Sequence, residues 1–142
     1  MKLWFNLFCR DPQAQLDFYC ALLGWPEAVQ SRSPIYRAVE QDGVQIGFNA
    51  PQAYALLGLG DRQAPDDTPA PVTAYATFML GSPGAVDAAA AFAHAHGGAV
   101  VKPPYATYYG QWQAVLADPE GHVFRASCAG LPPGIGPAAR PA

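Results

Sequence analysis

Apolar and polar residues alternate over short stretches of the first half of the chain, and one stretch between them has helical periodicity. Residues 3–9 alternate with a period of two and are rich in aromatic side chains, which predicts a β-strand. Asp11 can cap a helix that begins at Pro12, and an apolar stripe at helical spacing stops at Gly24, so we predict a helix of about three turns. Three further short strands are predicted over residues 26–31, 35–40 and 44–49. The predicted order of this half is βαβββ.

The second half of the chain repeats this order. Residues 72–80 alternate as a strand, Ser82 and Pro83 begin an alanine-rich helix that extends to His96, and Gly97 follows it. Three short strands are predicted after the helix, over residues 99–102, 111–117 and 122–127. One order of elements thus occurs twice at a spacing of about 70 residues. We therefore predict an α+β fold built from two βαβββ modules.

Glycine and proline mark the boundaries of these modules. The chain has 14 Gly and 15 Pro, which concentrate before residue 72, in the turns and after residue 128. The last segment offers too little apolar surface to bury, and we expect it to be mobile. The predicted organisation is a first module at 1–50, a linker with a short helix at 51–71, a second module at 72–128 and a flexible tail at 129–142.

Composition limits the classes of partner. The chain has 142 residues, of which 51% are hydrophobic, and this is enough for a core without disulfides. The net charge is −3, and the eight Lys and Arg residues are scattered rather than clustered as nucleic-acid binding requires. No apolar stretch approaches the roughly 20 residues of a membrane span, and three cysteines without a CxxC spacing fit a reducing compartment. We predict a cytoplasmic protein that binds neither nucleic acid nor membrane.

Several motifs, in their order, resemble one protein family. They are Asp11, Phe18-Tyr19 and Leu22-Leu23-Gly24 in the first half, and Gly98, Pro103-Pro104, Gly110 and Asp118-Pro119-Glu120-Gly121-His122 in the second. Over residues 1 to about 128 the chain resembles the vicinal oxygen chelate superfamily, which contains glyoxalase I, extradiol dioxygenases, fosfomycin-resistance enzymes and bleomycin-resistance proteins. The resemblance implies that the two modules form a curled, cup-shaped mixed sheet with helices on its outer face. It also implies a homodimer, often with halves exchanged between subunits.

The resemblance implies four positions for the ligands of a divalent metal, occupied by His, Glu or Gln in catalytic members. The first lies seven residues before the turn aspartate and falls on Trp4; the equivalent position of the second module falls on Tyr75. The position four residues after the glycine of the last turn is Arg125, and the remaining one is Gln45 or Gly47. Indole, phenol and guanidinium groups are poor or impossible ligands of a divalent cation. We predict no metal cofactor, with a divalent metal held by displaced ligands as the alternative.

The remaining histidines and cysteines do not form a site by their spacing. His94 and His96 are two positions apart on the predicted helix, so their side chains point to different faces. His122 begins the last strand, and we expect it to be held locally by the turn. No histidine accompanies a cysteine in a pattern typical of a cysteine nucleophile.

Alternation along the strands predicts which side chains share a face with the implied ligand positions. Asn6 and Phe8 share the face of Trp4, Thr77 and Met79 share that of Tyr75, and Val123 and Ser127 share that of Arg125. Aromatic residues of neighbouring strands and loops extend the predicted wall, namely Tyr36, Tyr105, Tyr108, Tyr109 and Trp112. The predicted ligand-binding set is Trp4, Asn6, Gln45, Tyr75, Thr77, Tyr109, Trp112 and Arg125.

An arginine among aromatic faces is typical of a site for a planar, anionic or electron-rich molecule. The leading hypothesis is a bacterial protein, similar to bleomycin-resistance proteins, that binds a small aromatic or anionic molecule in the cup without metal chemistry. One alternative is a metal-dependent glyoxalase-like isomerase, lyase or dioxygenase with displaced ligands, whose activity would depend on Gln45 or His122. The other is a non-catalytic scaffold, in which Trp4 and Tyr75 fill the cup and Arg125 pairs with an acid such as Glu40.

Overall fold

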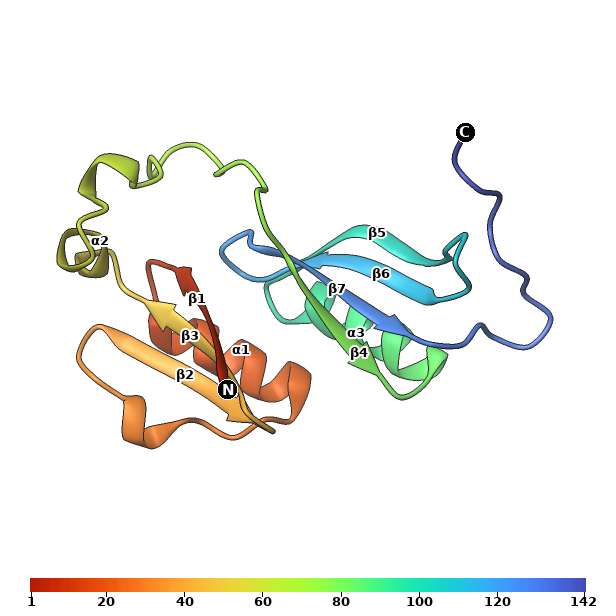
Figure 1. The fold of residues 1–142 in the computed structure, drawn as a ribbon, viewed down its shortest axis with the longest axis horizontal. Coiled ribbons are helices and arrows are strands. Elements are labelled where there is room, and N and C mark those ends of the chain that lie inside the picture. The colour runs from red at the N-terminus through yellow and green to blue at the C-terminus, as the bar shows by residue number, and fades with distance from the viewer. The chain divides into compact units, whose positions relative to one another are not determined.

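The computed structural model describes all 142 residues, which divide into two compact units, Met1–Ala70 and Pro71–Ala142 (Figure 1). Each unit contains one mixed β-sheet and one long helix packed on it. The predicted α+β fold of two βαβββ-like modules is confirmed. That the two sheets close into one cup stays a prediction.

The first unit contains a three-stranded sheet in the order β1-β3-β2. Its strands and helices are β1 (Leu3–Phe8), α1 (Pro12–Leu23), β2 (Tyr36–Gln41), β3 (Val44–Asn49) and α2 (Gln52–Leu56), with 3₁₀ turns at Val29–Ser31 and Gly60–Arg62. Strand β1 runs parallel to β3, and β2 runs antiparallel to it. The central strand β3 is therefore paired on both edges.

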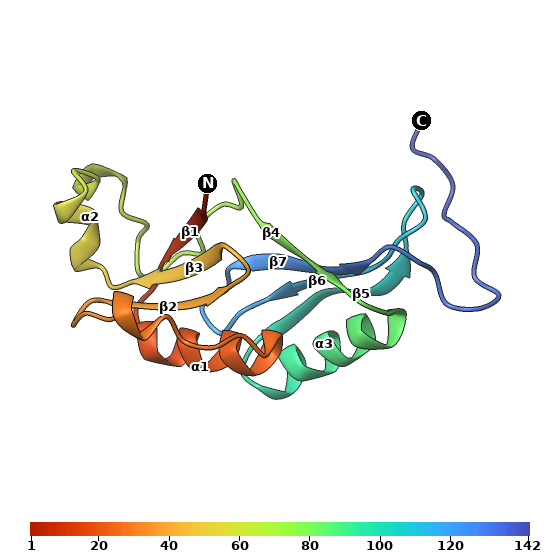
Figure 2. The same cartoon turned by 60° about the horizontal axis from the view of Figure 1, so that its bottom comes forward.

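Helix α1 begins and ends where the sequence predicts. The Asp11 carboxylate accepts a hydrogen bond from the Ala14 amide at 3.0 Å, and Gly24 ends the helix with a φ of 68°. The ring of Tyr19 on α1 stacks on that of Phe48 on β3, with centroids 5.2 Å apart. Since both side chains are almost fully buried, α1 covers one face of the sheet (Figure 2). The other face is contacted at one end by α2, whose Tyr54 ring stacks on Phe8 of β1.

The strand predicted over residues 26–31 was wrong. Only Glu27 forms a bridge, with Val39 of β2, and the chain then turns into the 3₁₀ segment. Two backbone hydrogen bonds hold this bridge, from Ala28 to the Ala38 carbonyl at 2.8 Å and from Glu40 to the Pro26 carbonyl at 3.1 Å. Pro26 has no N–H to donate, so the ladder of backbone hydrogen bonds does not continue on the N-terminal side of Glu27.

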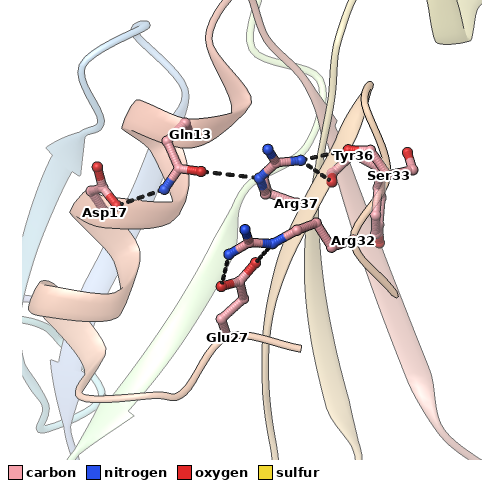
Figure 3. A network of polar contacts seen from close by, with 7 residues as sticks. All are labelled: Gln13, Asp17, Glu27, Arg32, Ser33, Tyr36 and Arg37. Atoms are coloured by element: carbon pink, nitrogen blue, oxygen red, sulfur yellow. Dashed lines mark hydrogen bonds and ion pairs between the residues drawn. The ribbon is translucent and has the colours of Figure 1, made fainter. Parts of the chain in front are cut away.

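Side chains then stabilise the loop in place of a strand (Figure 3). Arg32 donates two hydrogen bonds to the Glu27 carboxylate. Arg37 donates to the carbonyls of Ser33 and Tyr36, and its Nε donates to Gln13 Oε1 on α1 at 3.0 Å. The guanidinium group of Arg37 thus links the turn at Ser33 and Tyr36 to helix α1.

The second unit contains a four-stranded sheet in the order β4-β7-β6-β5. Its elements are β4 (Ala76–Leu80), α3 (Pro83–Ala95), β5 (Ala99–Ala106), β6 (Trp112–Ala117) and β7 (Val123–Cys128). Strands β4 and β7 are parallel, and the pairs β6–β7 and β5–β6 are antiparallel. Helix α3, capped by the Ser82 hydroxyl, packs on β5, β6 and β7 through small buried side chains (Figures 1 and 2).

Two strands of this sheet differ from their predicted lengths. Strand β5 continues through Pro103 and Pro104, although the prediction ended at Lys102. Because β5 is an edge strand, these prolines cost it few ladder hydrogen bonds, and the register shifts on both sides of Lys102. Strand β4 begins at Ala76 rather than at 72, so Tyr75 lies just before the strand.

The C-terminal segment makes backbone hydrogen bonds to the hairpin between β5 and β6. The Gly130 carbonyl accepts from the Trp112 amide at 3.3 Å, and the Ala138 amide donates to the Thr107 carbonyl at 3.1 Å. The predicted short helix of the linker corresponds to α2. None of the helices is long and apolar enough to cross a membrane.

Candidate functional site

Each sheet has one face that its long helix does not cover, and these two faces contain most of the predicted ligand-binding residues. We call the first the Gln45 face; it comprises Trp4, Asn6, Tyr36, Gln45 and Gly47. We call the second the Arg125 face; it comprises Tyr75, Thr77, Lys102, Tyr105, Tyr109, Gln113 and Arg125. Each face belongs to one unit and is described by itself.

Strand register assembles the Gln45 face. In the parallel pair of β1 and β3, Trp4 lies beside Gln45 and Asn6 lies beside Gly47. Residues at partner positions point to the same side of a sheet. The two candidates that the sequence left open, Gln45 and Gly47, therefore lie on the same face, next to Trp4 and Asn6 respectively.

A chain of hydrogen bonds crosses this face. The Ser31 hydroxyl donates to Gln45 Oε1 at 3.2 Å, Gln45 Nε2 donates to the Tyr36 hydroxyl at 2.9 Å, and that hydroxyl donates to Asn6 Oδ1 at 3.0 Å. Gln45 is fully buried, and both its amide atoms are engaged. Burial raises the pKa of Tyr36, and the hydrogen bond from Gln45 offsets part of this rise. These contacts leave the centre of the face neutral.

Gly47 provides the space for this chain. A Cβ atom at this position would lie 2.0 Å from the Tyr36 hydroxyl oxygen and 2.3 Å from Asn6 Oδ1. Real Cβ contacts of this length do not occur, so any side chain here would displace the tyrosine or the asparagine. Glycine is thus required at one of the positions where the family resemblance implies a ligand.

The Arg125 face is centred on the guanidinium group of Arg125. Thr77 on β4 is the partner of Arg125 on β7, and its hydroxyl accepts from Arg125 Nε at 2.9 Å. Arg125 Nη1 donates to the Tyr109 hydroxyl at 3.3 Å. The ring of Tyr75 lies beside the guanidinium group, with 5.0 Å between the ring centroid and the guanidinium carbon. Four residues of the predicted set are brought together here.

Arg125 has no carboxylate partner. The acid suggested by the sequence, Glu40, instead pairs with Lys2 at 3.3 Å in the first unit. The neighbours of Arg125 are two hydroxyl groups and an aromatic ring, none of which neutralises its charge. Within the second unit no carboxylate pairs with Arg125, and the alternative of an ion pair with an acid such as Glu40 stays a prediction.

Sequence reasoning missed the residue that organises the rest of this face. Gln113 on β6 is 2% exposed; its Oε1 accepts from the Tyr109 hydroxyl at 3.0 Å, and its Nε2 donates to the Tyr105 hydroxyl. The ammonium group of Lys102 lies 3.7 Å from the centroid of the Tyr105 ring. Two signals together could have identified Gln113. Alternation along β6 places it on the face of Val115, and Val115 pairs with Arg125.

Trp112 does not join this face. Its indole Nε1 donates to the Asp87 carboxylate on α3 at 2.8 Å, so the side chain lies on the helix-covered side of the sheet. Trp4 and Tyr75 are 55% and 51% exposed, so neither is a core residue. Trp112 therefore lies apart from the other predicted residues of its unit, and the alternative that Trp4 and Tyr75 fill the cup stays a prediction.

The residues at the implied metal positions do not fit a divalent cation. Their groups are an indole, a phenol, a guanidinium and either an engaged amide or a glycine. Nor does the structure contain a group of three or more His, Cys, Asp or Glu side chains arranged to hold a metal ion. We derive no chemical step through a metal at this site.

The other candidate groups are held in local structure. His122 Nδ1 lies 2.9 Å from an oxygen of the buried Asp118 carboxylate, as expected for a histidine held by its turn. Burial, together with the nearby Glu27 and Asp17 carboxylates, raises the pKa of the Cys20 thiol. A raised pKa disfavours the thiolate, so Cys20 lacks the activation of a cysteine nucleophile.

The chain is similar to known proteins in both sequence and structure. The sequence profile of the Glyoxalase/Bleomycin resistance protein/Dioxygenase superfamily matches residues 3–126. A glyoxalase/bleomycin resistance protein/dioxygenase family enzyme from Burkholderia phytofirmans PsJN is 36% identical, with a TM-score of 0.81 over 89% of this chain and 96% of that chain. A glyoxalase-related enzyme from Fulvimarina pelagi is 20% identical, with a TM-score of 0.73 over 90% of this chain and 87% of that chain, and shares the fold. No curated protein sequence gives a significant match.

Proposed function

Since the chain belongs to the Glyoxalase/Bleomycin resistance protein/Dioxygenase superfamily, we propose that it binds a small aromatic anion on the Arg125 face, without metal chemistry. The observation that carries the proposal is an unneutralised guanidinium group beside an aromatic ring. A carboxylate could accept hydrogen bonds from the arginine while the ring of the same molecule packs against Tyr75. The proposed site residues are Tyr75, Thr77, Tyr109 and Arg125.

The contacts of Arg125 support a binding role more than a structural one. Thr77 and Tyr109 accept from Nε and Nη1, which orients the group and leaves Nη2 without a protein acceptor. A guanidinium group that is fixed in place before the ligand arrives loses little side-chain entropy on binding. Nothing in its surroundings competes with an incoming anion for its charge.

The alternative of a metal-dependent isomerase, lyase or dioxygenase depended on Gln45 or His122. Gln45 is buried with both amide atoms engaged, and His122 is held by Asp118. Neither arrangement supports a displaced metal site, so we place the non-metal proposal first. The homodimer that the family resemblance implies stays a prediction.

The test measures the affinity for benzoate, with benzamide as the uncharged probe of similar shape, by titration calorimetry. Wild type should bind benzoate more tightly than benzamide, and Arg125→Gln should weaken benzoate binding by about 10-fold to 100-fold, as expected for a charge-assisted hydrogen bond. The matched control is Arg62→Gln, which removes an exposed arginine of the first unit and should leave the affinity unchanged. Equal benzoate affinity in wild type and Arg125→Gln, or equal affinity for the two probes, would contradict the proposal.

A further inference from the structure

The Arg125 face has a second group of hydrogen-bond donors at its other end, on strand β5. This group consists of the Lys102 ammonium group and the Tyr105 hydroxyl. Lys102 makes a cation–π contact with the Tyr105 ring at 3.7 Å and, like Arg125, has no carboxylate partner. The protein has a net charge of −3 and only eight Lys and Arg residues. Two of these cations lie unneutralised on one face of one sheet.

A chain of hydrogen bonds crosses this face from Arg125. A guanidinium group only donates, so the Tyr109 oxygen accepts from Arg125, and the Tyr109 hydroxyl donates its own proton to Gln113 Oε1. The Gln113 amide thus has Oε1 toward Tyr109 and Nε2 toward Tyr105. Because Nε2 only donates, the Tyr105 oxygen accepts and its proton has no acceptor within the protein. The Tyr109 proton is therefore used within the protein, whereas the Tyr105 hydroxyl can still donate its proton to a ligand.

Strand pairing places the two cations at opposite ends of one row. Lys102 on β5 is the partner of Val115 on β6, which in turn is the partner of Arg125 on β7. The Cα atoms of Lys102 and Arg125 are two strand spacings apart, which is about 10 Å. The apolar side chain of Val115 and the rings of Tyr105 and Tyr109 belong to the same part of the face. The row thus has a cation at each end and an apolar middle.

We propose that the ligand of the Arg125 face is an aromatic molecule with two anionic groups. One carboxylate binds Arg125, and the other binds the Lys102 ammonium group and the Tyr105 hydroxyl, with the aromatic part over Val115. This inference depends on the proposed function, because it names a second anchor for the ligand of the same site. It assigns Lys102 and Tyr105 as specificity residues for the second charge and Gln113 as the residue that positions the Tyr105 proton.

A structural explanation of Lys102 makes a different prediction. Lysine on an edge strand discourages pairing with another sheet, and β5 is an edge strand. If Lys102 acts only in this way, its replacement should not alter the affinity for any ligand. Measurement of affinity for probes with one and two charges therefore separates the two explanations.

The experiment compares benzoate with terephthalate and biphenyl-4,4′-dicarboxylate, whose carboxylates are separated by one and two rings. We expect at least one dicarboxylate to bind wild type about tenfold more tightly than benzoate, as a second charge-assisted contact predicts. Lys102→Gln and Tyr105→Phe should each reduce that advantage and leave benzoate affinity within about twofold. The control is Lys2→Gln, because Lys2 is the other lysine and lies in the first unit, paired with Glu40.

Gln113→Glu gives a second measurement on the same face. A carboxylate at this position accepts from both tyrosines, so the Tyr105 proton turns inward and no longer reaches the ligand. Its negative charge also weakens the binding of every anion on this face, so we expect this variant to lose the preference for the dicarboxylate and to bind benzoate more weakly as well. Thermal unfolding of each variant without probe shows that it is folded.

The outcomes separate this inference from the proposed function. If Arg125→Gln weakens benzoate binding while Lys102→Gln leaves the dicarboxylate advantage intact, the second anchor is wrong and the first stands. If wild type shows no preference for either dicarboxylate, the two-anion ligand is likewise overturned. If Arg125→Gln leaves all three probes unaffected, or wild type binds none of them, the proposed function fails and this inference fails with it.

Discussion

The Gln45 face and the Arg125 face are built from the same pair of side chains but differ in charge. Each has a buried glutamine whose Nε2 donates to a tyrosine hydroxyl, Gln45 to Tyr36 in the first unit and Gln113 to Tyr105 in the second. What differs is how each hydrogen-bond chain begins and ends.

On the Gln45 face the chain begins at the Ser31 hydroxyl and ends at the Asn6 carbonyl oxygen, so the tyrosine proton is used. On the Arg125 face it begins at a cation and ends at the Tyr105 hydroxyl, whose proton is not used. The first arrangement stabilises its own unit, whereas the second presents donors. The comparison teaches that the terminal residues, rather than the shared tyrosine and glutamine, decide which face can bind an anion.

The largest expected effect comes from filling the space that Gly47 leaves open. Gly47→Ala forces its new Cβ against the Tyr36 hydroxyl, so we expect the free energy of unfolding to fall by about 3 kcal/mol, the upper part of the range for overpacked sites. Urea denaturation measures this loss. Gly81→Ala is the control, since a Cβ at that position meets nothing within 4 Å. A loss no larger than that of the control would show that the Gln45 face is loosely packed.

The next effect distinguishes the roles of the two glutamines. Gln45→Met leaves the half-buried hydroxyls of Ser31 and Tyr36 without their amide partner, so the free energy of unfolding should fall by about 1 kcal/mol. Its benzoate affinity should stay within about twofold of wild type, because all the proposed site residues belong to the second unit. Calorimetric titration beside urea denaturation checks both. A tenfold loss of affinity in a folded Gln45→Met protein would contradict the assignment of separate roles.

A smaller effect should appear at high pH on the Gln45 face. The pKa of Tyr36 is raised in the folded protein, so above the ordinary tyrosine pKa of about 10 the unfolded chain loses its proton first. Stability from this group is therefore fully present below pH 10 and is lost as pH rises through the folded pKa. Denaturation curves from pH 8 to 11 should fall less steeply for Tyr36→Phe than for wild type. An identical slope would mean that Tyr36 ionises as easily in the folded state.

The smallest effect concerns the loop that replaces the third strand of the first module. The hydrogen bond from Arg32 lowers the pKa of Glu27, so this pair contributes above the ordinary glutamate pKa and its contribution is lost as pH falls through the lowered value. Because both groups are exposed, we expect only a slight difference in stability between wild type and Arg32→Gln at pH 7, and none at pH 2. Thermal unfolding at the two pH values is the measurement. A difference that persists at pH 2 would show that Arg32 acts through packing instead.

Much of the fold could be predicted from the sequence because its signals are local. The Asp11 and Ser82 caps, the prolines after them and Gly24 determine where α1 and α3 begin and where α1 ends, and the structure has both helices at the predicted places. The failed strand over 26–31 shows the limit. The segment pairs with β2 only at Glu27 and then turns into a 3₁₀ segment, and local alternation does not show how far two strands stay paired.

The site was predictable as far as strand alternation reaches. Alternation placed Thr77 on the face of Tyr75, and the family resemblance directed attention to Arg125; the strand pairing of Thr77 with Arg125 came from the structure. Alternation gave no means of choosing the face of Trp112, because that choice depends on the Asp87 carboxylate of α3. Gln113 was missed because a glutamine in a strand looks unremarkable until its two tyrosines are known.

The sequence by itself determined the duplicated order of elements, the helix ends and the absence of ordinary metal-ligating residues at Trp4, Tyr75 and Arg125. These properties depend on neighbouring residues or on the chemistry of single side chains. The tertiary structure alone decided which polar groups are satisfied and which are left to bind. These hydrogen bonds join residues that are distant in the sequence, and each has a direction. On the Gln45 face the series ends at the Asn6 oxygen, which accepts the last proton, whereas on the Arg125 face it ends at the Tyr105 hydroxyl, whose proton is not used.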